Sequence, residues 1–185
     1  MIFLPNKFER YTSALRNYIH LSAIKQGITQ RHLRLLSKIY AAEALFGREN
    51  VLPTDIKCLS ENLLLAAQLY FLESGQAFHF KAKRTGNFLI NPKLYTALLL
   101  SLCKKSTKAE VFTEKEKIII KGVGFNPYCK RFIKALNGGF IYERKTEALL
   151  IWLPAERTDK KAIETEKEWE FYLNPFSPVN IFLNQ

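Results

Sequence analysis

The chain has 185 residues, of which 48% are hydrophobic and 24% are charged. This length and balance predict a globular protein that buries its own core, and they exclude a disordered or fibrous chain. The first residues lack the basic start and long apolar stretch of a signal peptide. The longest nearly apolar run, residues 63–72, is too short to span a membrane, so we expect a cytoplasmic protein without membrane contact.

Cysteine usage and charge narrow the function classes further. Cys58, Cys103 and Cys129 are odd in number and share no metal-ligand spacing, so we expect free, buried thiols. The net charge is +11, and residues 78–145 hold 15 Lys or Arg against 4 Asp or Glu, which accounts for the whole excess. Such a segment attracts acidic protein surfaces, phosphates or nucleic acid, unless it is only a solvated face that aids solubility.

The first elements predicted are two amphipathic helices, over residues 7–26 and 30–46. Gly27 ends the first helix and Thr29 caps the second. Apolar residues recur at helical spacing in both. In the first helix they are Phe8, Tyr11, Leu15, Tyr18 and Ile19, with Ser22 on the same stripe, and in the second Leu33, Leu36, Ile39, Tyr40 and Leu45. The resulting hairpin hides its apolar face either by pairing with a second copy as a four-helix bundle or by packing on the rest of the chain.

Helices and strands alternate after the hairpin. Three further helices are expected: one opened by Pro53, Thr54 or Asp55 and running to about residue 73, one over residues 91–105, and one over 127–137. The expected strands are residues 78–82, 87–90, 109–113, 117–120, 139–144 and 148–152. This order predicts the α+β class, with a two-layer α/β sandwich that places three helices on one face of a mixed sheet.

The last thirty residues differ in composition. Residues 156–170 are highly charged and are expected as a linker or an exposed helix. The aromatic-rich remainder is broken by Pro175 and Pro178. A tail this apolar is expected to dock, either on its own sheet or on a partner.

The central half of the chain contains an ordered set of motifs. A helical segment, residues 91–106, precedes a β-branched strand with a Gly-x-Gly turn, Ile118-Ile-Ile-Lys-Gly-Val-Gly-Phe125. A Gly138-Gly139 pair that suits a left-handed helix cap follows, and then a final apolar strand, residues 148–154. This set resembles the ATPase domain of sensor histidine kinases, in the GHKL (Bergerat fold) family. The resemblance implies a dimerisation-like hairpin in residues 1–50, an ATPase-like domain in 51–154, and a linker with a tail in 155–185.

The resemblance also implies that the nucleotide site is degenerate. In the family an Asn on the helix ligates magnesium, but Ser101 to Ser106 occupy that place, with Lys105 at the ligand position. An ammonium group has no acceptor for a cation. Matching Gly122 and Gly124 to the family's glycines places Ile120 where an Asp binds adenine. The long lid is also shortened, so we expect no ATP binding, no metal ion and no cofactor.

The hairpin offers two histidines as phosphoacceptor candidates, His20 and His32. Leu21-Ser-Ala-Ile24 resembles the motif that follows the phosphorylated histidine in the family, but counting back places Leu15 at the acceptor position. The layout is similar to that of a sporulation phosphorelay phosphotransferase, which keeps a histidine on a dimeric hairpin beside a degenerate ATPase-like domain. A surface or packing role for both histidines stays open.

Three functions follow, in order of preference. The first is a non-catalytic, histidine-kinase-like interaction protein of bacterial two-component-type signalling, homodimeric through residues 7–46 and binding an acidic partner such as a receiver domain. The second is a histidine phosphotransferase. The third is nucleic-acid binding, suggested by the basic segment and by Thr29-Gln-Arg-His-Leu-Arg34, which resembles the start of a recognition helix.

Overall fold

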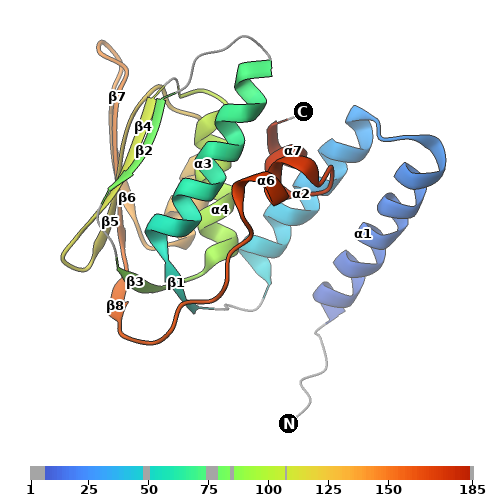
Figure 1. Cartoon of the computed structure of the whole chain (residues 1–185), viewed down its shortest axis with the longest axis horizontal. Coiled ribbons are helices and arrows are strands. Elements are labelled where there is room, and N and C mark those ends of the chain that lie inside the picture. The colour runs from blue at the N-terminus through green and yellow to red at the C-terminus, as the bar shows by residue number, and fades with distance from the viewer. Residues whose placement is uncertain (1–6, 48–50, 74–78, 84–85, 107, 184–185) are drawn as a thin grey trace.

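A computed structural model describes most of the chain, namely residues 7–47, 51–73, 79–83, 86–106 and 108–183. The two N-terminal helices, α1 (Lys7–Gln26) and α2 (Gln30–Phe46), have the predicted bounds and form a hairpin beside the α/β part of the chain (Figure 1). Thr29 caps α2 as predicted, because its side chain accepts a hydrogen bond from the His32 backbone N–H. No helix in these described ranges is long and apolar enough to cross a membrane.

The main sheet has five strands in the order β2-β4-β5-β7-β6. Its strands are β2 (His79–Lys83), β4 (Lys108–Glu114), β5 (Lys117–Val123), β6 (Gly139–Glu143) and β7 (Ala148–Pro154). β2 and β4 are parallel and the remaining neighbours are antiparallel, so the predicted mixed sheet is confirmed. β5 runs three residues beyond its predicted end at Ile120, because Gly122 stays in register with Ala109 and Leu149.

Three helices lie against this sheet: α3 (Ile56–Glu73), α4 (Pro92–Cys103) and α5 (Cys129–Ala135). α4 is the centre of the core, since every residue from Leu94 to Cys103 is buried. The buried side chains of β5 and β7, Ile118, Ile120 and Ile151, are fully enclosed. Asn91 starts α4 by accepting hydrogen bonds from two backbone N–H groups, as an N-cap residue does. The expected α+β fold is therefore confirmed.

A second, small sheet corrects two expectations. It joins β1 (Leu52–Asp55), β3 (Asn87–Ile90) and β8 (Glu156–Thr158) in the order β1-β3-β8. Pro53 and Thr54, predicted to open the third helix, lie in β1, and only Asp55 acts as a helix start by accepting from the Cys58 N–H at 3.0 Å. The charged segment, predicted as a linker or a helix, begins instead with strand β8. Both β1 and β8 are strands because each pairs with β3, which lies far from β8 in the sequence.

The C-terminal tail docks on its own chain. It forms two short helices, α6 (Glu168–Leu173) and α7 (Pro178–Leu183), and α7 contacts α2 and α4 while α6 contacts α3. Val179 and Phe182 of α7 are buried. The tail thus lies on helices rather than on the sheet, and Figure 1 shows α7 beside α2. It covers apolar surface that α2 and α4 would otherwise expose.

The end of α5 differs from the expected glycine cap. The left-handed residue is Asn137, with φ of 54°, while Gly138 and Gly139 have no positive φ. The glycines are needed for space instead: a Cβ on Gly138 would lie 2.6 Å from the Trp152 carbonyl oxygen, and one on Gly139 would overlap the Trp152 ring. Asn tolerates the left-handed region better than most residues do, which explains why Asn137 can take this conformation in place of a glycine.

The apolar stripe predicted for α1 is divided between two faces. Thr12, Ile19 and Ala23 are buried against the rest of the chain. Tyr11 and Tyr18, expected on the same stripe as Ile19, are each 71% exposed. In contrast α2 buries its predicted apolar side, Leu33, Leu36 and Ile39, and contacts α4 and α7. Helix α2 therefore packs on the rest of the chain, and the face of α1 that carries Tyr11 and Tyr18 is left exposed.

Candidate functional site

The Gly-x-Gly loop is held directly against the C-terminal end of α4. Gly124 has φ of +86°, and a Cβ at this position would overlap the Lys105 carbonyl oxygen. The Ser106 hydroxyl donates a hydrogen bond to the Gly124 carbonyl at 3.1 Å. The Asn126 side-chain amide donates to the Ser101 carbonyl at 2.9 Å. The loop is therefore held against the end of α4 by one close backbone approach and two side-chain hydrogen bonds.

The five positions matched to the family's nucleotide site are brought together only in part. Gly122 and Gly124 lie against the backbone that follows α4: a Cβ on Gly122 would come within 2.9 Å of the Lys108 carbonyl oxygen. Ser101 is buried and Lys105 is exposed at that end of α4. Ile120 is separate from them, since its side chain is fully buried in the core between sheet and helices. Ile120 thus belongs to the hydrophobic core.

A cavity of about 700 Å³ lies between α2, the end of α4, the start of α5 and α7. Ser101 and Lys105 line it, whereas Ile120, Gly122 and Gly124 do not. Its cationic side chains are Lys38, Lys104, Lys105 and Arg131, and its aromatic side chains are Phe46, Tyr128, Phe132 and Phe182. Burial lowers the pKa of the Lys104 ammonium below its ordinary value. Sequence reasoning missed this cavity, because it depends on how α2 lies over α4.

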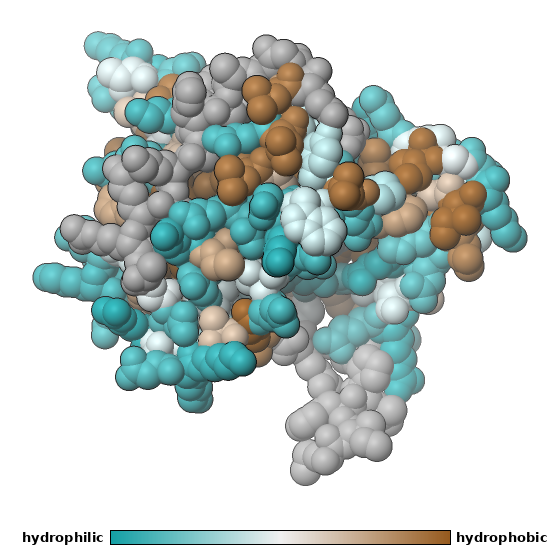
Figure 2. Space-filling model, viewed as in Figure 1, coloured by the Kyte–Doolittle hydropathy of each residue, from teal (hydrophilic) through white to brown (hydrophobic). Residues whose placement is uncertain are grey.

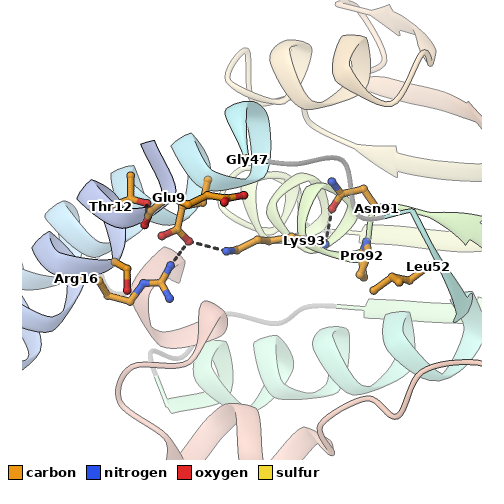
Figure 3. Close-up of a pocket in the computed structure, with 10 residues that line it drawn as sticks. Glu9, Thr12, Arg16, Gly47, Leu52, Asn91, Pro92 and Lys93 are labelled. Atoms are coloured by element: carbon orange, nitrogen blue, oxygen red, sulfur yellow. Dashed lines mark hydrogen bonds and ion pairs between the residues drawn. The ribbon is translucent and has the colours of Figure 1, made fainter. Parts of the chain in front are cut away.

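A second pocket, of about 310 Å³, lies where α1 and α2 meet the start of α4 (Figure 3). Arg16 from α1 and Lys93 from α4 both point toward the carboxylate of Glu43, with the Lys93 Nζ at 2.6 Å. The Glu43 side chain is only 10% exposed. This network joins the hairpin to the α/β part. Sequence reasoning missed this network. The feature that could have indicated it is that Glu43 is the only acidic residue of α2 and lies four residues after the buried Ile39.

We expect Glu43→Gln to lower the free energy of unfolding by about 1–3 kcal/mol, because two cations then face each other without a carboxylate in a partly enclosed place. Urea unfolding followed by circular dichroism measures the change. The control is Glu61→Gln, which breaks the exposed Lys57–Glu61 pair at 3.8 Å and should change stability by less than about 0.5 kcal/mol. Equal effects of the two substitutions would contradict a structural role for the Glu43 network.

His32 has both ring nitrogens engaged in the turn between α1 and α2. Its Nδ1 accepts from the Thr29 backbone N–H at 3.2 Å, and its Nε2 lies 3.2 Å from the Ser22 hydroxyl. Thr29 and His32 thereby form a reciprocal capping box. The Nδ1 nitrogen is therefore engaged in the cap. At the start of α2, Arg31 and Arg34 are exposed.

His20 is half-buried and packs at a tilt of 32° against Phe176 of the tail, with ring centroids 4.3 Å apart. Burial, with the Arg16 charge as a smaller cause, lowers the pKa of His20 below its ordinary 6.5. The imidazole is therefore neutral near pH 7. Leu15, at the position matched to the family's phosphorylated histidine, is 38% exposed on α1.

Because His20 is neutral and packed against Phe176 in the folded chain, we expect the stability of the fold to depend on pH. The unfolded chain binds a proton on this residue at a higher pH than the folded chain does. The contribution of His20 to the free energy of unfolding is therefore fully present above about pH 6.5 and is lost as the pH falls below that value. His20→Phe keeps a ring on Phe176 but takes no proton. We expect this variant to show a shallower loss of thermal midpoint between neutral and mildly acidic pH than the parent chain. Identical pH profiles would show that His20 makes no such contribution.

The cysteines are free thiols. Burial raises the pKa of Cys103 to about 12 and raises the pKa of Cys129 above its ordinary value, as expected for inert core thiols. Cys58 departs from the expectation, because it is half-buried and its sulfur lies 3.3 Å from the Thr165 hydroxyl.

Comparison with known proteins gives similarity to solved structures alone. No protein-family model matches the chain, and no curated protein sequence matches it. The chain is similar in structure to the Acinetobacter baumannii histidine kinase AdeS, with 13% identity and a TM-score of 0.47, over 82% of this chain and 98% of that chain. It is also similar to the cytoplasmic segment of the histidine kinase QseC, with 10% identity and a TM-score of 0.44, over 84% of this chain and 99% of that one.

Proposed function

We propose that this chain is a non-catalytic, histidine-kinase-like protein that acts as an interaction module in two-component-type signalling and does not bind ATP. The observation that supports it most is the closed contact between the Gly-x-Gly loop and the end of α4, made by Gly124 on the Lys105 carbonyl and by the Ser106 hydrogen bond. A nucleotide held between these segments would have to break both.

The side chains at the matched positions support the same proposal. Lys105 carries a positive charge where the family ligates magnesium, so it repels the ion that it would have to bind. Ile120 has no acceptor for the adenine amino group, and its full burial leaves no room for water to substitute. ATP hydrolysis and autophosphorylation both require the groups that these two residues replace.

The proposed self-association uses the outer face of α1. Four apolar side chains lie there at helical spacing: Tyr11, Leu15, Tyr18 and Leu21. Tyr18 and Leu21 are 71% and 59% exposed. Figure 2 shows apolar surface over the hairpin, and a second patch over α3, on the face that is drawn. Because a second copy presents the same stripe, pairing of two hairpins would bury it in a four-helix bundle.

The proposed partner is an acidic protein surface such as a receiver domain. The surplus of 11 positive charges lies within residues 78–145, which include most of the main sheet and α4. Attraction of this kind acts over about 10 Å at 0.1 M salt and weakens as salt is added.

Sedimentation velocity tests the proposed dimer. We expect the parent chain to sediment as a dimer, and the double variant Tyr18→Glu with Leu21→Glu to be monomeric with an unchanged circular dichroism spectrum. The matched control is Leu65→Glu with Leu69→Glu, which adds the same charges to exposed positions of α3 and should leave the dimer intact. A monomeric parent chain, or a dimer lost equally in both variants, would overturn the assignment to α1.

A histidine phosphotransferase is the second candidate, and the state of His20 favours it. This imidazole is neutral and half-exposed, which is what nucleophilic attack on the acyl phosphate of a phosphorylated receiver requires. In that step the ring nitrogen bonds to phosphorus while the aspartyl oxygen leaves as carboxylate. Loss of transfer in His20→Gln but not in His32→Gln would establish it. No transfer from a radiolabelled receiver to the parent chain would remove it.

A further inference from the structure

We propose that an exposed apolar patch on α3 and α6 is the docking surface for a basic amphipathic helix of a partner protein. The patch consists of Leu65, Leu69 and Leu72 of α3 with Trp169 and Leu173 of α6. Their exposed fractions lie between 40% and 67%. Contiguous apolar surface of this kind marks an interaction site on a globular domain. The inference goes beyond the proposed self-association, because the patch lies on other helices than α1.

The side chains of the patch form one surface because α6 follows α3. The two helices are in contact. The segment that leads into α6 is held on α3 by the Asn62 side-chain amide, which donates to the Glu166 carbonyl at 2.8 Å, and by Cys58, whose sulfur lies 3.3 Å from the Thr165 hydroxyl. The three leucines continue the same stripe of α3 toward its C-terminal end. Figure 2 shows this apolar surface over α3.

The spacing of the patch fits a helix as the partner. Leu65, Leu69 and Leu72 recur at helical spacing on one face of α3, and Trp169 and Leu173 lie one turn apart on α6. A third helix packs on such rows through an apolar stripe of its own. Strand addition has no comparable basis, since helices already bond their backbone N–H and C=O groups internally.

The charges beside the patch favour a basic partner. Glu168 precedes Trp169 in the first turn of α6, and Glu61 lies one turn before Leu65 on α3. Residues 164–170 hold four Glu and one Lys, although the whole chain has a net charge of +11. A helix with Lys or Arg beside its apolar stripe is therefore complementary to this surface. The positive segment of residues 78–145 disfavours the same helix elsewhere on the molecule.

The same charges disfavour the other occupants of an apolar patch. In a two-fold contact between two copies, each copy presents the same leucines and the same acidic residues, so like charges would face each other. An anionic lipid surface would meet Glu61 and Glu168 with charge of the same sign. A basic helix satisfies both the apolar and the acidic part of the surface.

Fluorescence titration of the full chain with a model peptide tests the proposal. The probe is a helix-forming peptide of about 14 residues made of leucine and lysine, with the leucines on one face. We expect it to bind and to move the emission of Trp169 to shorter wavelength, because docking removes the indole from water. Trp152, the other tryptophan of the chain, lies against Gly139 on the main sheet and should not respond. Trp169→Phe keeps a ring in the patch and should abolish the spectral shift.

Anisotropy of the labelled peptide compares the affinities of variants. Leu69→Ala with Leu72→Ala should weaken binding by at least about tenfold, because a few central side chains carry most of the energy of an interface. Glu61→Gln with Glu168→Gln should weaken it by about threefold to tenfold. The control is the α1 double variant that disrupts the proposed dimer. It should leave the peptide affinity unchanged, which separates this surface from the outer face of α1.

Two further peptides keep the test decisive without any variant. A leucine–lysine peptide of the same composition, with its leucines spread around the helix, should bind at least about tenfold less tightly. A leucine–glutamate peptide should show no binding that depends on Leu69. Absence of binding, equal binding of the two lysine peptides, or an affinity that the leucine variant leaves unchanged would overturn the proposal. Loss of self-association in Leu69→Ala with Leu72→Ala would assign the patch to a second copy and would overturn it as well.

Discussion

Gly124→Ala is expected to lower the free energy of unfolding by about 2–5 kcal/mol. A Cβ in the left-handed region costs about 1–2 kcal/mol by itself. At Gly124, where φ is +86°, this Cβ would also overlap the Lys105 carbonyl oxygen, which belongs to the backbone directly after α4. Forcing an atom into packed surroundings adds about 1–3 kcal/mol. Urea unfolding of both chains under identical conditions measures the difference.

Gly27→Ala is the matched control for this prediction. Gly27 has nearly the same φ, +81°, but no atom lies within 4 Å of the position of an added Cβ. The control should therefore lose only the conformational part, about 1–2 kcal/mol. A loss at Gly124 no greater than that at Gly27 would show that the loop is not pressed on α4, and the closed-site argument would lose its main support.

Ile120→Asp places a carboxylate at the position matched to the adenine-binding Asp of histidine kinases, and it is expected to unfold the chain rather than to create a nucleotide site. The Ile120 side chain is fully buried among apolar neighbours, and an unpaired charge there costs at least about 4 kcal/mol. Since small domains are stable by only about 5–15 kcal/mol, most of the stability is lost. Thermal denaturation checks this, with Ile120→Val as control and an expected loss of about 0.5–1.5 kcal/mol. A folded Ile120→Asp chain that binds ATP would contradict the interpretation.

Local signals in the sequence were sufficient to predict most helices and strands. Thr29 and Asn91 both start helices through side-chain caps, and the bounds of α1 and α2 are those expected. The charged turn between β4 and β5 also lies where alternation in the flanking strands places it, with Lys115 at φ 51°. These features depend on contacts within a few residues, which is why a sequence shows them.

Elements that depend on distant contacts were not predicted. β1 and β8 are strands because β3 lies between them, and neither has a strand pattern of its own. The division of α1 into a buried and an exposed face depends on where α2 lies, so spacing alone placed Tyr18 and Ile19 on one stripe. The Glu43 network and the cationic cavity each join three or more elements, so neither has a local motif.

Calorimetry with ATP, with and without magnesium, tests the central claim most directly. The claim is that the side chains which would bind a nucleotide are replaced at Lys105 and Ile120, and that the loop at Gly124 is packed against the residues that follow α4. The predicted result is no measurable binding of ATP in either condition. Tight binding of ATP that depends on magnesium would contradict the account.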